Sequence, residues 1–162
     1  MSAGTLGGAR TPWHLWAVGV VTVLWNGFGC FDYTMTQTRR DEWFAQMGMT
    51  PDQLAYFEAM PAWTHGAWAI GVWGGLLGGV LLLLRRKLAM PVFVVSFLGW
   101  LAGAVYAFAL SDGLEAMGSM WPMQIVIGAG CLFFIWYAWT MSKTGVLRGR
   151  AQSRADGGGR FA

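Results

Sequence analysis

The residue types that could do chemistry gather in one segment, residues 25–40, which reads WNGFGCFDYTMTQTRR. It carries Asn26, Asp32, Tyr33 and two terminal arginines, although the residues before it are almost all apolar. An amide, a carboxylate and a phenol in close succession can hydrogen-bond a polar ligand. They can equally mark the end of a helix that leaves a membrane for water. The choice depends on the elements that position these side chains.

The composition places those side chains in a membrane protein. Of the 162 residues, 56% are hydrophobic and only 12% are charged, whereas an average soluble domain has about 25% charged residues. The chain also holds 24 glycines and 11 tryptophans, and both types are frequent in membrane helices or at their ends. A soluble domain would need more charge to cover its surface. We therefore expect an all-α integral membrane protein.

Four apolar segments have the roughly 20 residues that a spanning helix requires. They are residues 13–33, 62–84, 90–110 and 120–141, and they predict a four-helix transmembrane bundle within residues 13–141. Residues 1–12 form a short polar segment before the bundle, and residues 34–61 form a long loop between the first two helices. Residues 142–162 form a basic, Gly-rich tail that we expect to be disordered.

The basic residues predict the orientation of the bundle. Nine of the eleven lysines and arginines fall on the side of the two termini and the second loop, and only Arg39 and Arg40 fall on the other side. Short loops rich in Lys and Arg stay in the cytoplasm, so we expect both termini inside the cell and residues 34–61 outside. The basic tail then lies near anionic lipid, which favours a topological anchor over a nucleic-acid partner.

The long outer loop contains helix signals of its own. Thr50, Pro51 and Gln53 stand where a capping box and a proline in the first turn begin a helix, and Pro61 ends it. Before this helix, the first spanning helix can continue beyond the membrane until Gly48. We expect the two segments to form a helical hairpin on the outer surface.

Rows of glycine indicate how the spanning helices pack. Gly71, Gly75 and Gly79 recur every four residues in the second span, and Gly99 and Gly103 repeat this spacing in the third. Such rows let helix backbones approach closely. We expect this packing to lie within one chain, with a homo-oligomer as the alternative.

The polar side chains of the spans fall mainly in the outer part of the membrane once the helices are oriented. One interpretation is a shallow pocket that opens outward, with Asn26 as its floor and Asp32 facing His65 above it. Arg39 or Arg40 would neutralise the carboxylate. Tryptophan faces beside amide and carboxylate groups suit a small neutral polar ligand such as a sugar. The candidate ligand-binding residues are Asn26, Asp32, Tyr33, Arg39, His65 and Gln124.

The alternative interpretation of these residues is structural. Asp32, Tyr33 and His65 lie within about two helical turns of the interface, where side chains can reach water. Asn26 could hydrogen-bond to a neighbouring helix, which contributes on average about 0.6 kcal/mol. The sequence leaves both interpretations open.

The sequence does not contain the residue arrangements that several kinds of chemistry require. No ionisable side chain lies at the middle of a span, where charges cost at least about 2.5 kcal/mol and usually mark proton or ion relays. His14 and His65 fall on opposite sides of the membrane, so they cannot share a haem or a metal ion. Cys30 and Cys131 lie in apolar segments at different depths, which favours free thiols over a disulfide. We therefore expect a protein that is not an enzyme and holds no cofactor or metal.

The stretches WNGFGCFDYTMTQTR, TPDQLAYF and GVWGGLLGGVLLLLRR resemble a family of small four-span bacterial inner-membrane proteins. That family is seen mainly in Alphaproteobacteria, and its members are often labelled sugar transporters. The resemblance covers most of the chain, roughly Trp13 to Trp139, and carries over no catalytic or binding residue. It implies a multi-pass protein of the bacterial inner membrane.

Two functions follow as hypotheses. The first is a small transport-related or ligand-binding membrane protein that uses the outward-facing pocket. The second is a non-catalytic accessory subunit whose glycine rows and outer hairpin hold a larger membrane complex together. The lipid bilayer is the one partner that both hypotheses require.

Overall fold

The computed structural model describes residues 10–148, and every element in this range is a helix. Four of the helices are long and apolar enough to cross a membrane. They are α1 (Trp13–Thr38), α4 (Ala62–Leu83), α5 (Ala89–Val105), which a π-helical turn η1 (Tyr106–Leu110) continues, and α7 (Pro122–Lys143). The expectation of an all-α four-helix membrane bundle is confirmed.

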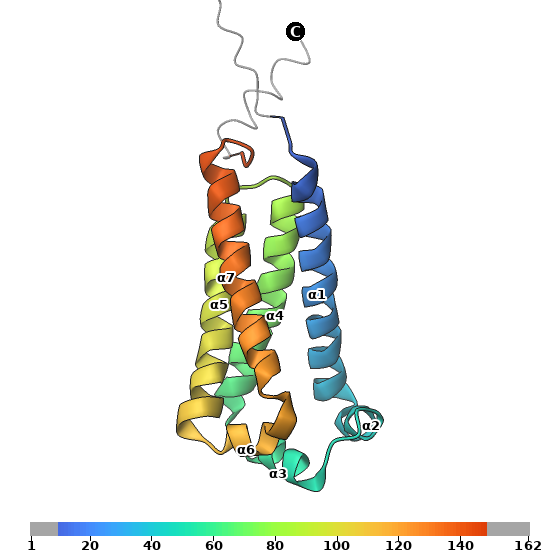
Figure 1. Cartoon of the computed structure of the whole chain (residues 1–162). Coiled ribbons are helices and arrows are strands. Elements are labelled where there is room, and N and C mark those ends of the chain that lie inside the picture. Colours follow the sequence, from blue (N-terminus) through green and yellow to red (C-terminus); the bar gives the residue numbers. More distant parts are fainter. Residues whose placement is uncertain (1–9, 149–162) are drawn as a thin grey trace, which may run out of the picture.

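The short helices all lie at one end of the bundle, which we call the cap end (Figure 1). They are α2 (Arg40–Gln46), α3 (Pro51–Ala59), α6 (Gly113–Met117) and the 3-10 turn η2 (Gly118–Met120). The start of α1 and the end of α7 lie together at the opposite end, which we call the terminal end. The long helices pack in chain order, α1 against α4, α4 against α5, and α5 against α7.

The apolar core lies at the terminal end. Leu15 of α1, Leu82 of α4 and Leu147, which follows α7, have no exposed surface. His14 Nδ1 lies 2.6 Å from Tyr137 Oη, so α1 and α7 also meet here. The remaining buried members come from α5, α7 and the segment after it: Ala89, Phe93, Tyr137, Ala138, Met141 and Val146. All four long helices are thus joined at this end.

The segment after α7 corrects the expectation of a disordered tail from residue 142 onward. Helix α7 extends to Lys143, and Val146 and Leu147 are buried against the apolar core. Apolar residues within a basic tail were the sequence signal for this packing. The expectation is wrong for residues 142–148, while residues 149–162, like residues 1–9, lie outside the described range.

A short backbone pairing ties this segment to the loop between α4 and α5. The Arg148 N–H donates to the Arg85 carbonyl at 2.6 Å, and the Lys87 N–H donates to the Arg148 carbonyl at 3.2 Å. The two bonds form a parallel β-bridge between Arg86 and Arg148. We call residues 85–87 with Arg148 the basic bridge.

The end of α1 also differs from the expectation. Arg39 leaves the helical conformation, with φ −138° and ψ 43°, so α1 stops at Thr38 instead of continuing to Gly48. Helix α2 begins at the next residue and turns away from the α1 axis (Figure 1). Gly48, with φ 66°, then redirects the chain toward α3. The outer hairpin is therefore formed by α2 and α3 alone.

The predicted start of α3 is confirmed. The Gln53 N–H donates to Thr50 Oγ1 at 3.3 Å, and the Thr50 N–H donates to Gln53 Oε1 at 3.0 Å. Pro51 takes the first helical position, where its missing N–H costs nothing. This capping box fixes where the second helix of the hairpin begins.

Glycines of α4 let α1 approach it closely. A Cβ on Gly75 would collide with the side chain of Asn26, and a Cβ on Gly79 would lie 3.0 Å from the Thr22 side chain. Gly71 contributes on the other face of α4, where a Cβ would lie 3.5 Å from the Trp100 backbone nitrogen of α5. The glycine row thus serves contacts within one chain.

The two glycines of α5 differ in their surroundings. A Cβ on Gly99 would lie 2.7 Å from the Ala67 carbonyl oxygen and 2.8 Å from the Gly71 nitrogen of α4. A Cβ on Gly103 would have nothing within 4 Å. Equal spacing in the sequence therefore hides unequal packing.

We predict that Gly99→Ala lowers the free energy of unfolding by about 1–3 kcal/mol, because backbone atoms of α4 cannot move aside for the new methyl group. Gly103→Ala is the matched control. It should leave stability unchanged or raise it by up to about 1 kcal/mol, since alanine favours the helix more than glycine does. Unfolding in detergent measures both, and equal stability of the two variants would contradict the α4–α5 contact described here.

Candidate functional site

Asn26 lies at the contact between α1 and α4. Its Nδ2 donates to the Thr22 carbonyl of its own helix at 2.9 Å, and its carboxamide occupies the space that Gly75 leaves open. Because a larger residue at position 75 would displace this amide, the two positions depend on each other. The structure thus gives Asn26 a role in packing α1 against α4. This role differs from the expected one, which was to form the floor of an outward pocket.

Asp32 joins α1 to α2. Its Oδ1 accepts a hydrogen bond of 2.7 Å from the indole Nε1 of Trp43. The same indole meets Phe31 edge-on, with ring centroids 5.4 Å apart. These contacts hold α2 against α1 directly after the chain bends at Arg39.

His65 has a different partner, which corrects the expectation that it faces Asp32. Its Nδ1 lies 3.1 Å from Nε2 of Gln37, so this pair connects α4 with the last turn of α1. Asp32 lies earlier on α1 and bonds Trp43. The carboxylate and the imidazole therefore belong to two separate contacts.

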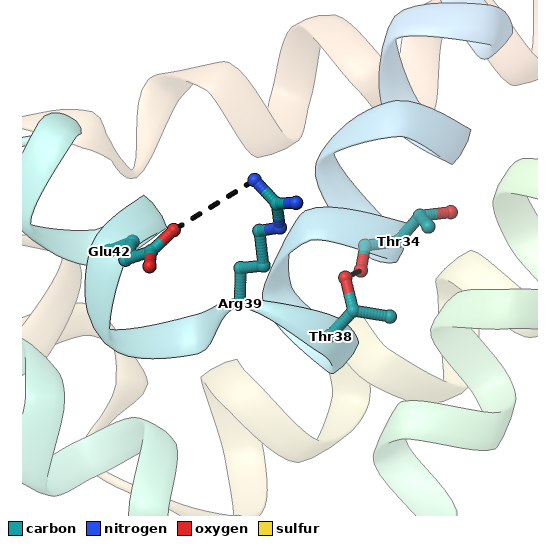
Figure 2. A network of polar contacts seen from close by, with 4 residues as sticks. All are labelled: Thr34, Thr38, Arg39 and Glu42. Atoms are coloured by element: carbon teal, nitrogen blue, oxygen red, sulfur yellow. Dashed lines mark hydrogen bonds and ion pairs between the residues drawn. The ribbon is translucent and has the colours of Figure 1, made fainter.

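Arg39 does not neutralise Asp32 either. Its guanidinium lies 4.0 Å from Glu42, and these two side chains are 66% and 71% exposed. Figure 2 shows this contact beside the last turn of α1, where Thr38 Oγ1 donates to the Thr34 carbonyl at 2.7 Å. Exposed ion pairs contribute between zero and about 1 kcal/mol, so this pair adds little to stability.

Gln124 belongs to another part of the bundle, between α5 and α7. Its Oε1 accepts a hydrogen bond of 3.1 Å from Trp100 Nε1. The Trp100 ring fills the space beside Gly128, where any Cβ would collide with it. Asp32, Arg39, His65 and Gln124 thus each have a polar partner outside the set of six candidate residues.

Aromatic rings link the cap to α1 and α4. Tyr33 meets Trp68 edge-on at 5.1 Å between ring centroids. Trp68 lies 6.3 Å from Phe57 of α3, and Phe57 lies 5.0 Å from Phe44 of α2. Of the candidate residues, Tyr33 therefore begins a chain of rings that reaches the hairpin.

Tyr56 of α3 provides a link that the sequence did not indicate. Its Oη lies 3.0 Å from Ser111 Oγ, and Ser111 in turn donates to the Tyr106 carbonyl at 2.9 Å. That carbonyl belongs to the π-helical turn η1, where the regular helix bonding changes. Gly113 lies so close to Tyr56 that a Cβ would be 2.6 Å from its Oη. Helix α3 is thereby held against η1 and α6.

A cavity of about 410 Å³ lies between α2 and α3, and we call it the cap cavity. Its apolar lining comes from Phe44, Ala45, Met49 and Leu54, and its charged lining from Arg40, Asp41 and Glu58. None of the six candidate residues lines it. The sequence feature that came nearest to indicating this cavity was the capping box of α3. It predicts the helix that carries Leu54 and Glu58.

The lining of the cap cavity combines apolar and charged side chains. Its apolar side chains can cover a hydrophobic group, and its carboxylates and guanidinium can pair with charges. The lining includes no hydroxyl, thiol or imidazole that could act as a nucleophile or base near neutral pH. Within residues 10–148, moreover, no three or more His, Cys, Asp or Glu side chains lie close enough to hold a metal ion.

Comparisons with protein families, with curated proteins and with solved structures gave no match to this chain.

Proposed function

We propose that this chain is a non-catalytic binding protein of the bacterial inner membrane, with its cap outside the cell and its termini in the cytoplasm. The cap cavity carries the proposal, because it is a hollow with apolar walls and charged groups at the water-facing end of the bundle. Clefts of this size accept small molecules. The resemblance to small four-span bacterial proteins supports the bacterial inner membrane as the location.

Charge supports the proposed orientation. Arg85, Arg86 and Lys87 follow the end of α4, and Lys143 ends α7. Both helices end at the terminal end (Figure 1). The cap carries six exposed carboxylates, on Asp41, Glu42, Asp52, Glu58, Asp112 and Glu115. Because Lys and Arg are retained in the cytoplasm, the terminal end faces inward and the cap outward.

The same charges indicate the class of ligand. The cap has six exposed carboxylates against the two guanidiniums of Arg39 and Arg40, so its field attracts cations from about 10 Å away at 0.1 M salt. In the cavity itself, Asp41 and Glu58 outnumber Arg40. We propose a small organic cation or zwitterion with an apolar body in place of the neutral polar ligand.

The accessory-subunit hypothesis has support of its own. Asn26, Asp32 and His65 are engaged with other groups of this chain, so they serve to hold the membrane part together. The cap is likewise fixed to the long helices by Trp43 and Tyr56. A rigid bundle with a fixed outer surface is what an assembly subunit needs.

Orientation can be tested by labelling single cysteines in a Cys30→Ala/Cys131→Ala background. We predict that Asp52→Cys and Glu115→Cys in the cap react with a membrane-impermeant maleimide on intact cells. Lys87→Cys should react only after lysis, because the α4–α5 loop then faces the cytoplasm. All three introduced residues replace exposed side chains. The reverse pattern would overturn the orientation.

The ligand class can be tested by thermal unfolding of the purified protein with a panel of organic cations, zwitterions and sugars. We predict that a cationic or zwitterionic compound raises the Tm. Asp41→Asn/Glu58→Gln should weaken its binding about tenfold or more, since hydrogen bonds to charged groups contribute about 1.5–3 kcal/mol. Glu42→Gln/Asp52→Asn removes the same charge from the cap outside the cavity and should keep most of the affinity. Equal losses in the two variants would contradict binding in the cap cavity.

Purification in mild detergent with mass spectrometry separates the two functions. If the chain is a binding protein, we predict that it purifies alone or as an oligomer of itself. A stoichiometric larger membrane partner that is lost in Trp43→Phe, which loosens α2 by removing the bond to Asp32, would favour the accessory subunit instead.

A further inference from the structure

In the described part of the chain, basic residues are concentrated at the terminal end. Arg85, Arg86 and Lys87 follow one another in the α4–α5 loop, and Lys143 ends α7. Seven of the eight acidic residues of the chain lie on α1 near the cap or in the cap itself, and the eighth, Asp156, lies outside the described range. Among residues 10–148, the acidic side chains therefore lie at or near the cap, whereas Arg86 and Lys87 lie in the loop at the opposite end.

The fold holds these cations in place. Arg85 adopts a left-handed conformation with φ 55°, which is unfavourable for a residue with a side chain. In this conformation its carbonyl accepts the Arg148 N–H, and its guanidinium donates to Thr11 Oγ1. The loop is thus fixed on both sides, and Arg86 and Lys87 are the next two residues of this fixed backbone. An anion that binds the cations of two consecutive residues lowers their electrostatic free energy.

Aromatic side chains place the basic bridge at the level of lipid headgroups. Trp13, Trp136 and Trp139 are exposed near the same end, as is usual where a helix meets the membrane surface. The Lys143 ammonium lies 3.8 Å from the centre of the Trp139 ring. The cations therefore stand at the depth where phospholipid phosphates lie.

We propose that the basic bridge is a binding site for the phosphate of an anionic phospholipid, with Arg86 and Lys87 as the residues that contact it. Two adjacent donors with positive charge can form charge-assisted hydrogen bonds to phosphate oxygens. The bound headgroup offsets the repulsion between these side chains. It thereby stabilises the loop that joins α4 and α5 to the end of α7. This site is separate from the cap cavity and does not depend on it.

The test uses the whole protein in nanodiscs of phosphatidylcholine, with and without an equal amount of phosphatidylglycerol. The anionic lipid should raise the Tm of the wild type. Arg86→Gln/Lys87→Gln should lose most of this rise, although its Tm in phosphatidylcholine alone should stay near that of the wild type, because the bridge itself is made by backbone atoms. The exchange Arg86→Lys/Lys87→Arg keeps both charges and should keep the rise.

Arg154→Gln/Arg160→Gln is the matched control, because it removes the same number of charges from residues that are not part of the basic bridge. It should keep most of the rise in Tm. If it loses as much as the loop variant, the lipid acts through general attraction, and the proposed site is wrong. The proposal is also overturned if the wild type shows no rise, or if Arg86→Gln/Lys87→Gln retains it.

Discussion

In a bilayer the lipid tails are as apolar as leucine, so burial of apolar side chains does not by itself hold helices together. Close contact between backbones must do so, and α4 provides it on two faces. Its glycines bring α1 close on one face and α5 close on the other. On the α5 side, Ser96 Oγ donates to the Gly71 carbonyl at 2.6 Å, a bond that requires this short separation. The order of packing, with α4 between α1 and α5, follows from this constraint.

The same constraint explains what the polar side chains do. Where α1 and α4 touch, Asn26 fills the space of a missing side chain at Gly75. Where the helices reach the cap, side chains can pair across longer gaps, and Asp32 and His65 bond residues of different elements. A polar side chain among apolar ones must find a partner because an unpaired one costs free energy. Pairing within the chain therefore accounts for polar groups that resemble a ligand site in the sequence.

The sequence predicts the four spans, the glycine packing and the capping box, because each depends on local composition or spacing. It fails where contacts join distant segments. Arg39 breaks the first helix although no glycine or proline marks the place, and Leu147 packs into the core from a segment that reads as tail. The expectation that Asp32 faces His65 is wrong for the same reason, since depth in the membrane does not tell which side chains face each other. The cap cavity depends on how α2 and α3 are oriented, which only the three-dimensional contacts determine.

The two ends of the bundle are held by different forces. The terminal end combines a buried apolar cluster with backbone bonds of the basic bridge. The cap depends on single side-chain contacts, of which Trp43 with Asp32 and Tyr56 with Ser111 are the main hydrogen bonds. Each such bond contributes only about 0.5–1.5 kcal/mol in water. The rings of Tyr33, Trp68, Phe57 and Phe44 add edge-on contacts that also connect the cap to the long helices. The cap is thus held by several weak side-chain contacts acting together, whereas the terminal end is held by a buried cluster and backbone hydrogen bonds.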